Sequence, residues 1–321
     1  MPERPVTGRF APTPSGRMHL GNVLCALLAW LSVRSAGGRM VLRIEDLDTR
    51  RCPAKNAALL EDDLRWLGLD WDEGGSLGGP HGPYYQSACA CVYQPYLQQL
   101  QRQGLVYPCF CTRAELHAAN APHLSDGRVV YSGKCRRLSP EAAAQKAHVH
   151  PPALRLRVPD ARVAFVDRCQ GVYTQDLALD CGDFLVRRSD GVFAYQLAVV
   201  IDDARMGVTE VVRGRDLLGS TPAQLYLHRM LGLPAPDYAH IPLLLAPDGR
   251  RLSKRDGDLD LQALRARLPG PEPILGLLGH LCGLLPKPKP LPAKAMVPLF
   301  SWEKIRREDI RLPGTRLFGS P

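Results

Sequence analysis

Residues 8–44 read GRFAPTPSGRMHLGNVLCALLAWLSVRSAGGRMVLRI, a stretch with the pattern of a strand, a helix and a second strand. The first segment, 8–11, is short and strand-like, and the two prolines of residues 12–16 prevent a helix from starting there. From 21 to 36 apolar residues recur at helical spacing up to a Gly-Gly pair, and residues 40–44 are again strand-like. This order predicts a right-handed crossover unit of a parallel sheet.

The pattern continues downstream of this unit. Pro53 is placed to open a second helix, because proline is favoured at the first helical position. Strand-like segments return at 184–187, 193–201 and 208–213, and a helix is expected over about 221–231. The sequence therefore predicts an α/β fold with a doubly wound parallel sheet of the Rossmann type.

Composition changes along the chain and predicts four regions. Residues 1–106 form the first half of the catalytic sheet domain, and 107–166 form an insertion that is rich in cysteines and short polar segments. Residues 167–256 form the second half of the sheet domain. Residues 257–321 form a short helical C-terminal segment, which includes the stiff, exposed spacer PKPKP (residues 286–290).

Composition and charge narrow the class of protein. The 321 residues are 45% hydrophobic and 23% charged, which is ordinary for a soluble enzyme. An apolar run long enough for a membrane span and an apolar signal-peptide core are both absent from the sequence, so we expect a cytoplasmic protein. The net charge of +9 favours a polyanionic partner such as nucleic acid, although the 41 basic residues are spread along the chain and also fit a generally Arg-rich proteome.

The loop APTPSGRMHLGN (residues 11–22) lies between the first strand and the first helix, where a doubly wound sheet binds ligands. The following helix directs free amide groups and its positive dipole end at an anion. Gly21 allows the backbone to approach a nucleotide, and His19 can donate to phosphate oxygens in the transition state. A proline-rich loop with an incidental histidine is the competing interpretation of this segment alone.

A second candidate motif is RRLSKRDG (residues 250–257). A basic loop with a central lysine is suited to clamp a triphosphate, because Lys254 is a compact charge that can follow the phosphates. A solvated run of surface charge is the ordinary interpretation of such a segment. The two motifs in this order are more specific than either one alone.

HLGN (residues 19–22) and RLSKR (residues 251–255) resemble the two signatures of the class I aminoacyl-tRNA synthetases. Asn22 stands where the first signature usually has His, and Arg251 stands where the second often has Lys; both substitutes are hydrogen-bond donors. The resemblance implies an ATP substrate with Mg²⁺, held mainly by phosphate oxygens and water. It implies ATP-binding residues His19, Gly21, Asn22 and Lys254, and catalytic residues His19, Lys254, Ser253 and Arg251.

Three further motifs resemble the glutamyl branch of this family: RFAPTPSG (9–16), LRIEDLD (42–48) and GVTEVVRGRDL (207–217). L-Glutamate has two carboxylates and one ammonium, so its pocket needs cations and an anion. Arg9 and Arg213 can hold the carboxylates and Glu45 the ammonium, and which arginine takes which carboxylate stays open. For each arginine alone, a surface ion pair is the competing interpretation. The resemblance implies a glutamate site of Arg9, Ala11, Thr13, Glu45, Tyr195 and Arg213.

Cysteines of the insertion form a candidate metal site. CFC (residues 109–111) and YSGKC (residues 131–135) provide Cys109, Cys111 and Cys135, and three thiolates with a fourth ligand suit one tetrahedral, structural Zn²⁺. The short glutamyl-type relatives carry a similar arrangement, which implies Tyr131 as the fourth ligand. His117 and His123 lie in the intervening loop and compete for this role. By contrast, Cys89 and Cys91 are expected on a helix, where their thiols point apart.

The second signature ends near Asp256, and the 65 residues after Asp256 are fewer than a usual domain contains, so we expect no anticodon-binding domain. Short chains of this kind resemble the glutamyl-queuosine tRNA(Asp) synthetases. This resemblance implies that glutamate is joined to AMP and then transferred to the cyclopentene ring of queuosine, at the wobble position of tRNA(Asp). We expect the enzyme to act as a monomer.

Three alternatives stay open at this point. A truncated glutamyl-tRNA synthetase would charge the acceptor end of tRNA(Glu). A non-catalytic glutamate- or adenylate-binding module would bind glutamate without exchanging pyrophosphate, and only Asn22 and Arg251 favour it. A zinc-dependent RNA-binding protein would leave both nucleotide signatures unexplained.

Overall fold

The computed structural model describes residues 5–116, 130–250, 252 and 260–313. Within these residues, the largest sheet has seven strands in the order β3-β2-β1-β9-β10-β6-β7. Every neighbouring pair that the structure records is parallel except β6 and β7, which form an antiparallel hairpin at one edge. In that order the strands are Glu73–Gly74, Arg39–Leu42, Thr7–Phe10, Glu210–Gly214, Asp237–Ile241, Arg162–Asp167 and Gly171–Asp176.

The first crossover unit confirms the prediction from residues 8–44. β1 pairs with β2 in parallel, and α1 (Leu20–Ser35) connects them. Two further helices that the sequence predicted are also present, as α2 (Ala54–Trp66) and α7 (Thr221–Leu231). The strand order β3-β2-β1-β9-β10 is that of a Rossmann-type sheet, with the first half of the chain on one side and the second half on the other.

The sheet is covered on both faces, as its alternating side chains require. In β2, Met40 and Leu42 pack with α1 in the largest hydrophobic cluster, whereas Val41 belongs to a cluster on the opposite face. In β9, Val212 likewise belongs to the largest cluster and Val211 to the cluster on the opposite face. Strands buried on both faces have continuous apolar runs, which is why the sequence of these segments does not alternate.

The prediction of a strand over 193–201 is wrong. Only Phe193 makes a bridge, to Arg187, and the helix α6 (Tyr195–Arg205) begins two residues later. The residues Leu197, Ala198, Val200 and Ile201 are buried in this helix. A short apolar run that is buried all round has the same pattern in a strand and in a helix, so periodicity could not distinguish them.

A second, antiparallel sheet is formed by β4 (Val106–Cys109), β5 (Ala153–Leu156) and β8 (Phe184–Arg187). It adjoins α3 (Ala90–Arg102), and α4 (Arg113–Leu116) and α5 (Pro140–Val149) follow β4 in the chain. Between β5 and β8 the chain leaves this small sheet to add the β6–β7 hairpin to the large one.

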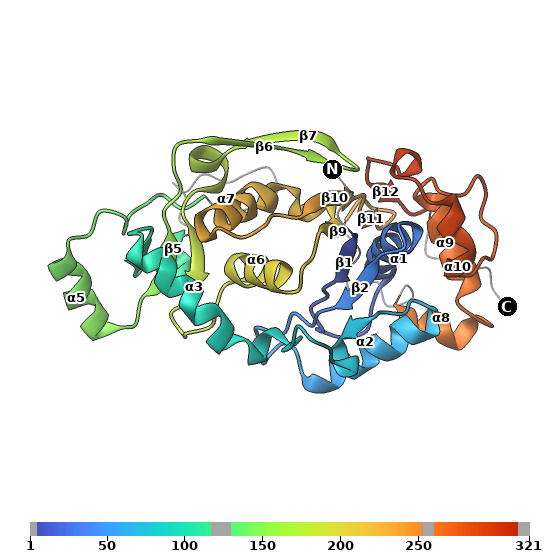
Figure 1. Cartoon of the computed structure of the whole chain (residues 1–321), viewed down its shortest axis with the longest axis horizontal. Helices are drawn as coiled ribbons and strands as arrows, with labels where there is room; N and C mark the ends of the chain where they lie inside the picture. The colour runs from blue at the N-terminus through green and yellow to red at the C-terminus, as the bar shows by residue number, and fades with distance from the viewer. Residues whose placement is uncertain (1–4, 117–129, 251, 253–259, 314–321) are drawn as a thin grey trace.

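Figure 1 shows α5 and the small sheet at one end of the molecule and the C-terminal helices at the other, with the large sheet between them. The C-terminal helices are α8 (Leu261–Arg267), α9 (Glu272–Leu281) and α10 (Ala293–Met296). After them β12 (Ile310–Arg311) pairs in parallel with β11 (Leu244–Leu245), so the C-terminal segment returns to the large domain. Among the helices described, none has the length and apolar character to cross a membrane.

Candidate active site and cysteine cluster

A cavity of about 750 Å³ lies at the carboxyl ends of β1, β2, β9 and β10. This volume is within the range of small-molecule sites, roughly 300–1,000 Å³. All nine of the predicted substrate residues that lie in the described part of the chain line it: Arg9, Ala11, Thr13, His19, Gly21, Asn22, Glu45, Tyr195 and Arg213. Residues separated by two hundred positions therefore meet at one site.

His19 is the N-cap of α1. Its Nδ1 accepts a hydrogen bond from the Gly21 amide (3.1 Å), and the Asn22 side chain accepts one from the His19 amide (3.2 Å), which together form a capping box. Since Nδ1 is an acceptor here, the neutral imidazole carries its proton on Nε2. The geometry therefore prepares His19 as a hydrogen-bond donor.

Gly21 leaves room for this histidine. A Cβ at position 21 would lie 3.0 Å from both Cε1 and Nδ1 of His19. A larger residue would crowd the imidazole ring, which would have to shift by a few tenths of an ångström. The glycine therefore keeps space for His19 in addition to the backbone approach that the sequence predicted.

A buried network of charges forms the floor of the cavity. Arg43 is fully buried; its Nη1 donates to Asp203 (2.7 Å) and its Nη2 lies 3.3 Å from Glu45. Arg9 donates to the carbonyl oxygen of Val212 (2.9 Å), and its Nε lies 3.5 Å from Asp203. Buried charges are stable only when paired, so these contacts hold Arg9 and Glu45 in fixed positions.

Burial raises the pKa of the Glu45 carboxyl, and the charges of Arg43 and Arg9 oppose that rise. The same arginines hold the pKa of Asp203 below its usual value although burial acts the other way. Asp203 is thus the constant negative charge of the network. Glu45 is the group whose charge is more easily lost.

Arg213 extends from β9 and is 4% exposed. Its Nε donates to His240 Nε2 (2.9 Å) and its Nη2 to Thr221 Oγ1 (2.8 Å). Its Nη1 lies 3.5 Å from the hydroxyl of Tyr195, another residue that lines the cavity. Burial raises the pKa of that tyrosine, so its hydroxyl stays protonated at neutral pH.

Several residues of the site were missed from sequence. Arg43, Asp203, His240 and Thr221 are buried beneath the cavity, and Ser15, Cys25, Arg51 and Asp216 line it. The signal for the first group was a charged or polar residue inside a buried segment, such as the arginine in VLRI (residues 41–44). Arg251, Ser253 and Lys254 of the second signature lie outside the described residues, but Leu252 between them lines the cavity.

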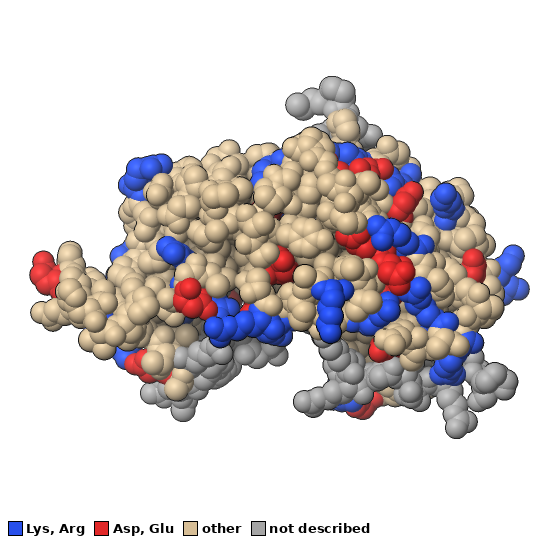
Figure 2. Space-filling view, turned by 90° about the horizontal axis from the view of Figure 1, so that it is seen from below, with Lys and Arg blue, Asp and Glu red and all other residues tan. Residues whose placement is uncertain are grey.

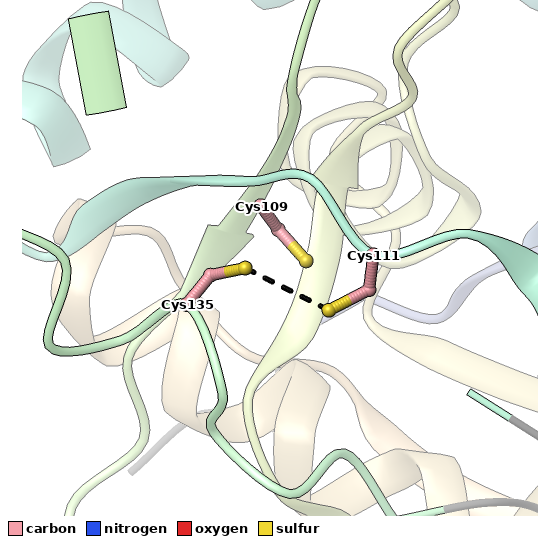
Figure 3. A group of neighbouring side chains, drawn as sticks. All are labelled: Cys109, Cys111 and Cys135. Carbon is pink, nitrogen blue, oxygen red and sulfur yellow. Dashed lines mark hydrogen bonds between the residues drawn. The ribbon is translucent and has the colours of Figure 1, made fainter. Parts of the chain in front are cut away.

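The three predicted cysteines meet at the end of β4. Figure 3 shows the sulfur atoms of Cys109, Cys111 and Cys135 turned toward one another. The three sulfur atoms lie within 4.8 Å of one another, and the sulfur atoms of Cys111 and Cys135 are 3.6 Å apart. His117 and His123, the alternative fourth ligands, lie outside the described residues.

The hydroxyl of Tyr131 lies beside the three sulfur atoms and is the fourth candidate ligand atom. Its hydroxyl oxygen lies 3.5 Å from the sulfur of Cys109 and 3.7 Å from that of Cys111. Around a tetrahedral zinc with bonds of about 2.3 Å to sulfur and about 2.0 Å to oxygen, sulfur atoms are about 3.8 Å apart and sulfur and oxygen about 3.5 Å. The donor set and its spacing therefore fit a tetrahedral zinc ion.

Arg155 of β5 supports this cluster from outside. Its Nε donates to the sulfur of Cys109 (3.3 Å), its Nη1 donates to the carbonyl oxygen of Asp183 (2.7 Å), and its guanidinium lies 3.9 Å from the centre of the Tyr131 ring. Burial opposes ionisation of Cys109, yet hydrogen bonds with Tyr131, from the Cys111 backbone and from Arg155 hold the pKa of its thiol below the usual value.

As predicted, Cys89 and Cys91 do not share a site, although only Cys91 lies within the helix and Cys89 precedes it. Cys89 is buried at the N-cap of α3, whereas Cys91 in the first turn is exposed, so the two thiols face different surroundings. Neither belongs to the cluster of Cys109, Cys111 and Cys135.

The chain is similar in sequence and in structure to known tRNA synthetases. The family model for the catalytic domain of class I tRNA synthetases (E and Q) matches residues 5–280. Glutamyl-Q tRNA(Asp) synthetase of Symbiobacterium thermophilum is 52% identical over 309 residues, 95% of each chain, and that of Nitratidesulfovibrio vulgaris is 49% identical over 92% of each chain. The solved glutamate tRNA ligase of Elizabethkingia meningosepticum, in complex with its amino acid, is 29% identical with a TM-score of 0.83 over 98% of this chain and 68% of that one.

Proposed function

Because this chain belongs to the class I tRNA synthetases of the glutamate and glutamine type, we propose that it activates L-glutamate with ATP and transfers it to queuosine in tRNA(Asp). It is a ligase of the aminoacyl-tRNA synthetase kind. The observation that carries the proposal is the meeting of two arginines and one glutamate with the capped His19 in one cavity. We place the enzyme in the cytoplasm, acting as a monomer.

In the first step a glutamate carboxylate oxygen attacks the α-phosphorus of ATP, which forms glutamyl-adenylate and releases pyrophosphate. Arg9 and Arg213 hold the carboxylates, Glu45 pairs with the ammonium, and Tyr195 closes the same side of the pocket. Ala11 and Thr13 position the substrate from the loop after β1. Both arginines are held by hydrogen bonds within the protein, so they are aligned before the substrate binds.

The phosphates bind beside the N-terminus of α1. His19 donates from Nε2 to phosphate oxygens, and Gly21 and Asn22 form the adjoining turn of the ATP site. Lys254, with Arg251 and Ser253, stabilises the charge that develops as pyrophosphate leaves. Magnesium accompanies ATP as part of that substrate.

In the second step a hydroxyl of the cyclopentene ring of queuosine attacks the acyl carbon, which forms an ester and releases AMP. A vicinal diol on a five-membered ring resembles the terminal ribose that ordinary synthetases acylate. The acceptor assignment is supported by the two glutamyl-Q tRNA(Asp) synthetases described above. Their sequences align with this chain over nearly their whole length, and about half of the aligned residues are identical.

A basic surface agrees with an RNA substrate. Figure 2 shows Lys and Arg side chains gathered along the middle of the face seen from below, with Asp and Glu between them. Arg51 lines the cavity itself. Positive charge attracts phosphate backbones, so the basic side chains of this face and Arg51 in the cavity support an RNA substrate.

Charging of tRNA(Glu) at its acceptor end is the second candidate. The resemblance to a solved glutamate tRNA ligase favours it, since that enzyme shares the fold over 98% of this chain. The higher identity to glutamyl-Q tRNA(Asp) synthetases favours the queuosine acceptor.

We also propose that Cys109, Cys111, Cys135 and Tyr131 hold one structural zinc ion. These residues form a small hydrophobic cluster with Tyr107 and Phe110, separate from the larger cores. So small a cluster contributes little stability by itself, and a metal can supply the rest. The ion would link β4 to the segment around residue 131.

A charging assay tests the function directly. Purified protein is incubated with ATP and labelled glutamate, together with queuosine-containing tRNA(Asp), the same tRNA without queuosine, or tRNA(Glu). We expect label only on the queuosine-containing tRNA. Label on tRNA(Glu) would show a short glutamate tRNA ligase, and absence of both label and glutamate-dependent pyrophosphate exchange would show a binding module.

A further inference from the structure

We propose that Asp167 and His240 are positioning residues that set the direction of Arg213, and that through it they determine the affinity for glutamate. The inference rests on the proposed function, because it assumes that Arg213 holds a glutamate carboxylate. Neither Asp167 nor His240 lines the cavity. Both act through the arginine, from the β6–β7 hairpin and from β10.

The three side chains form a buried row. Asp167 Oδ2 lies 2.5 Å from His240 Nδ1, and His240 Nε2 accepts from Arg213 Nε at 2.9 Å. Asp167 is 1% exposed and His240 0%, so water does not compete for these bonds. Hydrogen bonds in such a dry environment are strong and directional.

The hydrogen-bond partners of the two ring nitrogens of His240, Arg213 and Asp167, permit only one tautomer. Arginine has donors only, so Nε2 of the histidine must provide the lone pair that meets Arg213. An ionised aspartate has acceptors only, so Nδ1 must carry the proton. The row therefore has one consistent arrangement, in which a neutral imidazole connects a carboxylate to a guanidinium.

The titration behaviour agrees with this arrangement. Burial, opposed by the bond to Asp167 and aided by the charge of Arg213, lowers the pKa of His240 to about 4. Hydrogen bonds from His240 and from backbone amides hold the pKa of Asp167 below its usual value against burial. At neutral pH His240 is therefore uncharged and Asp167 is ionised.

Asp167 is itself fixed by the turn that follows β6. Its Oδ1 accepts from the amides of Cys169 (3.0 Å) and Gln170 (2.8 Å), and the amide of His240 is shared between Oδ1 (3.0 Å) and Oδ2 (3.1 Å). The side chain of Gln170 donates to the His240 carbonyl oxygen (2.8 Å). The hairpin thus holds β10 at the point where His240 meets Arg213.

The bond to His240 leaves part of Arg213 for a ligand. Nε and Nη2 are occupied by His240 and Thr221, whereas Nη1 reaches toward Tyr195 on the cavity side. A guanidinium anchored at two nitrogens has little freedom to rotate. Its remaining donors therefore point in one direction before glutamate arrives, which lowers the entropy cost of binding.

Asp167→Asn is the most informative variant, because it keeps the shape and reverses the tautomer. The amide keeps its oxygen at the Oδ1 position, because the N–H groups of Cys169 and Gln170 donate only there, whereas that of His240 is shared between the two oxygens. Its NH₂ group then faces Nδ1 of His240, which places the imidazole proton on Nε2, opposite Arg213 Nε. Arg213 loses its acceptor while every residue of the cavity is unchanged.

The experiment measures glutamate-dependent ATP–pyrophosphate exchange for the wild-type enzyme and for Asp167→Asn. Leaving a buried donor unpaired costs about 1–3 kcal/mol, so we expect the KM for glutamate to rise roughly 10- to 100-fold. We expect the KM for ATP and the kcat to stay within about twofold. Asp237→Asn is the matched control, since Asp237 is exposed on the same strand as His240 and pairs with Arg168.

Two variants of His240 provide a rescue series. His240→Gln can place an amide oxygen toward Arg213 and its NH₂ toward Asp167, whereas His240→Leu can do neither. We expect the KM for glutamate to increase from wild type to Gln to Leu. Equal values for Gln and Leu would contradict a role through hydrogen bonding.

The outcomes separate the inference from the proposed function. A glutamate KM for Asp167→Asn equal to that of Asp237→Asn would overturn the inference, as would equal losses for glutamate and ATP, which indicate general disturbance of the fold. Wild-type enzyme without glutamate-dependent exchange would overturn the proposed function, and the inference with it. Thermal unfolding of each variant identifies any that has lost the fold.

Discussion

The proposed glutamate pocket and the cysteine cluster are both built from residues far apart in sequence, but they differ in what holds them together. In the pocket, Arg9, Arg43 and Arg213 are each held by carboxylates, carbonyls or a neutral histidine of the protein itself. In the cluster, three thiols and one phenol face a common centre, and the guanidinium of Arg155 lies outside it. The pocket carries its own counter-charges, whereas the cluster brings together four side chains for which we propose an ion at the centre.

Because of this difference, we expect the two sites to contribute differently to stability. The pocket is supported by the large sheet and its cores, so a change in one of its ligand-binding groups should alter binding more than folding. The cluster lies in a small sheet with a core of few residues, so loss of its ion should alter folding more than binding. The variants below test whether the two effects separate in this way.

The largest effect is expected for Arg213→Ala. Removing a charged partner of a substrate carboxylate costs several kcal/mol, so the KM for glutamate should rise roughly 100- to 1,000-fold in pyrophosphate exchange. The midpoint of thermal unfolding should change little. Arg229→Ala, at an exposed position of α7, is the control. An unchanged KM would remove Arg213 from the glutamate site.

Cys135→Ser should have the opposite profile. Zinc content, measured by elemental analysis, should fall from about one ion per chain to nearly none, because one thiolate ligand is lost. The midpoint of thermal unfolding should fall by roughly 5–10 °C while the glutamate KM is retained. The exposed Cys91→Ser is the matched control. Full zinc content in Cys135→Ser would contradict the assigned ligand set.

The pH dependence of glutamate binding should reveal Glu45. Burial raises the pKa of its carboxyl, so on acidification it takes up a proton at a higher pH than an ordinary glutamate, whose pKa is about 4.3. The protonated form no longer attracts the substrate ammonium, so affinity should fall as the pH falls through this raised pKa. In Glu45→Gln the affinity should be about tenfold lower at neutral pH and nearly independent of pH. The exposed Glu303→Gln should keep the wild-type profile.

A smaller effect is expected for Arg155→Met. Groups that donate hydrogen bonds to metal ligands typically affect metal affinity by 10- to 100-fold, and we expect about tenfold weaker zinc binding in competition with a chelator. The glutamate KM should not change. Arg157→Met is the control, because the guanidinium of Arg157 lies over the ring of Tyr107 and not over that of the proposed ligand Tyr131. Equal zinc affinities of the two variants would show that Arg155 does not support the site.

Much of the catalytic site was predictable from sequence because its residues belong to short motifs. His19, Gly21 and Asn22 follow one strand, Glu45 follows the next, and both positions are set by local order of strand, loop and helix. The three cysteines were likewise predicted to meet, from two short segments. The helix over Tyr195–Arg205 was mistaken for a strand, because an apolar run buried on every side has no distinctive period.

What the sequence determined by itself is therefore local: the first crossover unit, the loops that end its strands, and the residue types that a nucleotide, a glutamate and a metal require. The tertiary structure alone decided how buried charges are paired. Arg43 meets Asp203 160 positions away, and Arg213 meets Asp167 only through His240. A buried charge is stable only beside a partner, and the partner can come from any segment that packing brings near, so no local pattern identifies it.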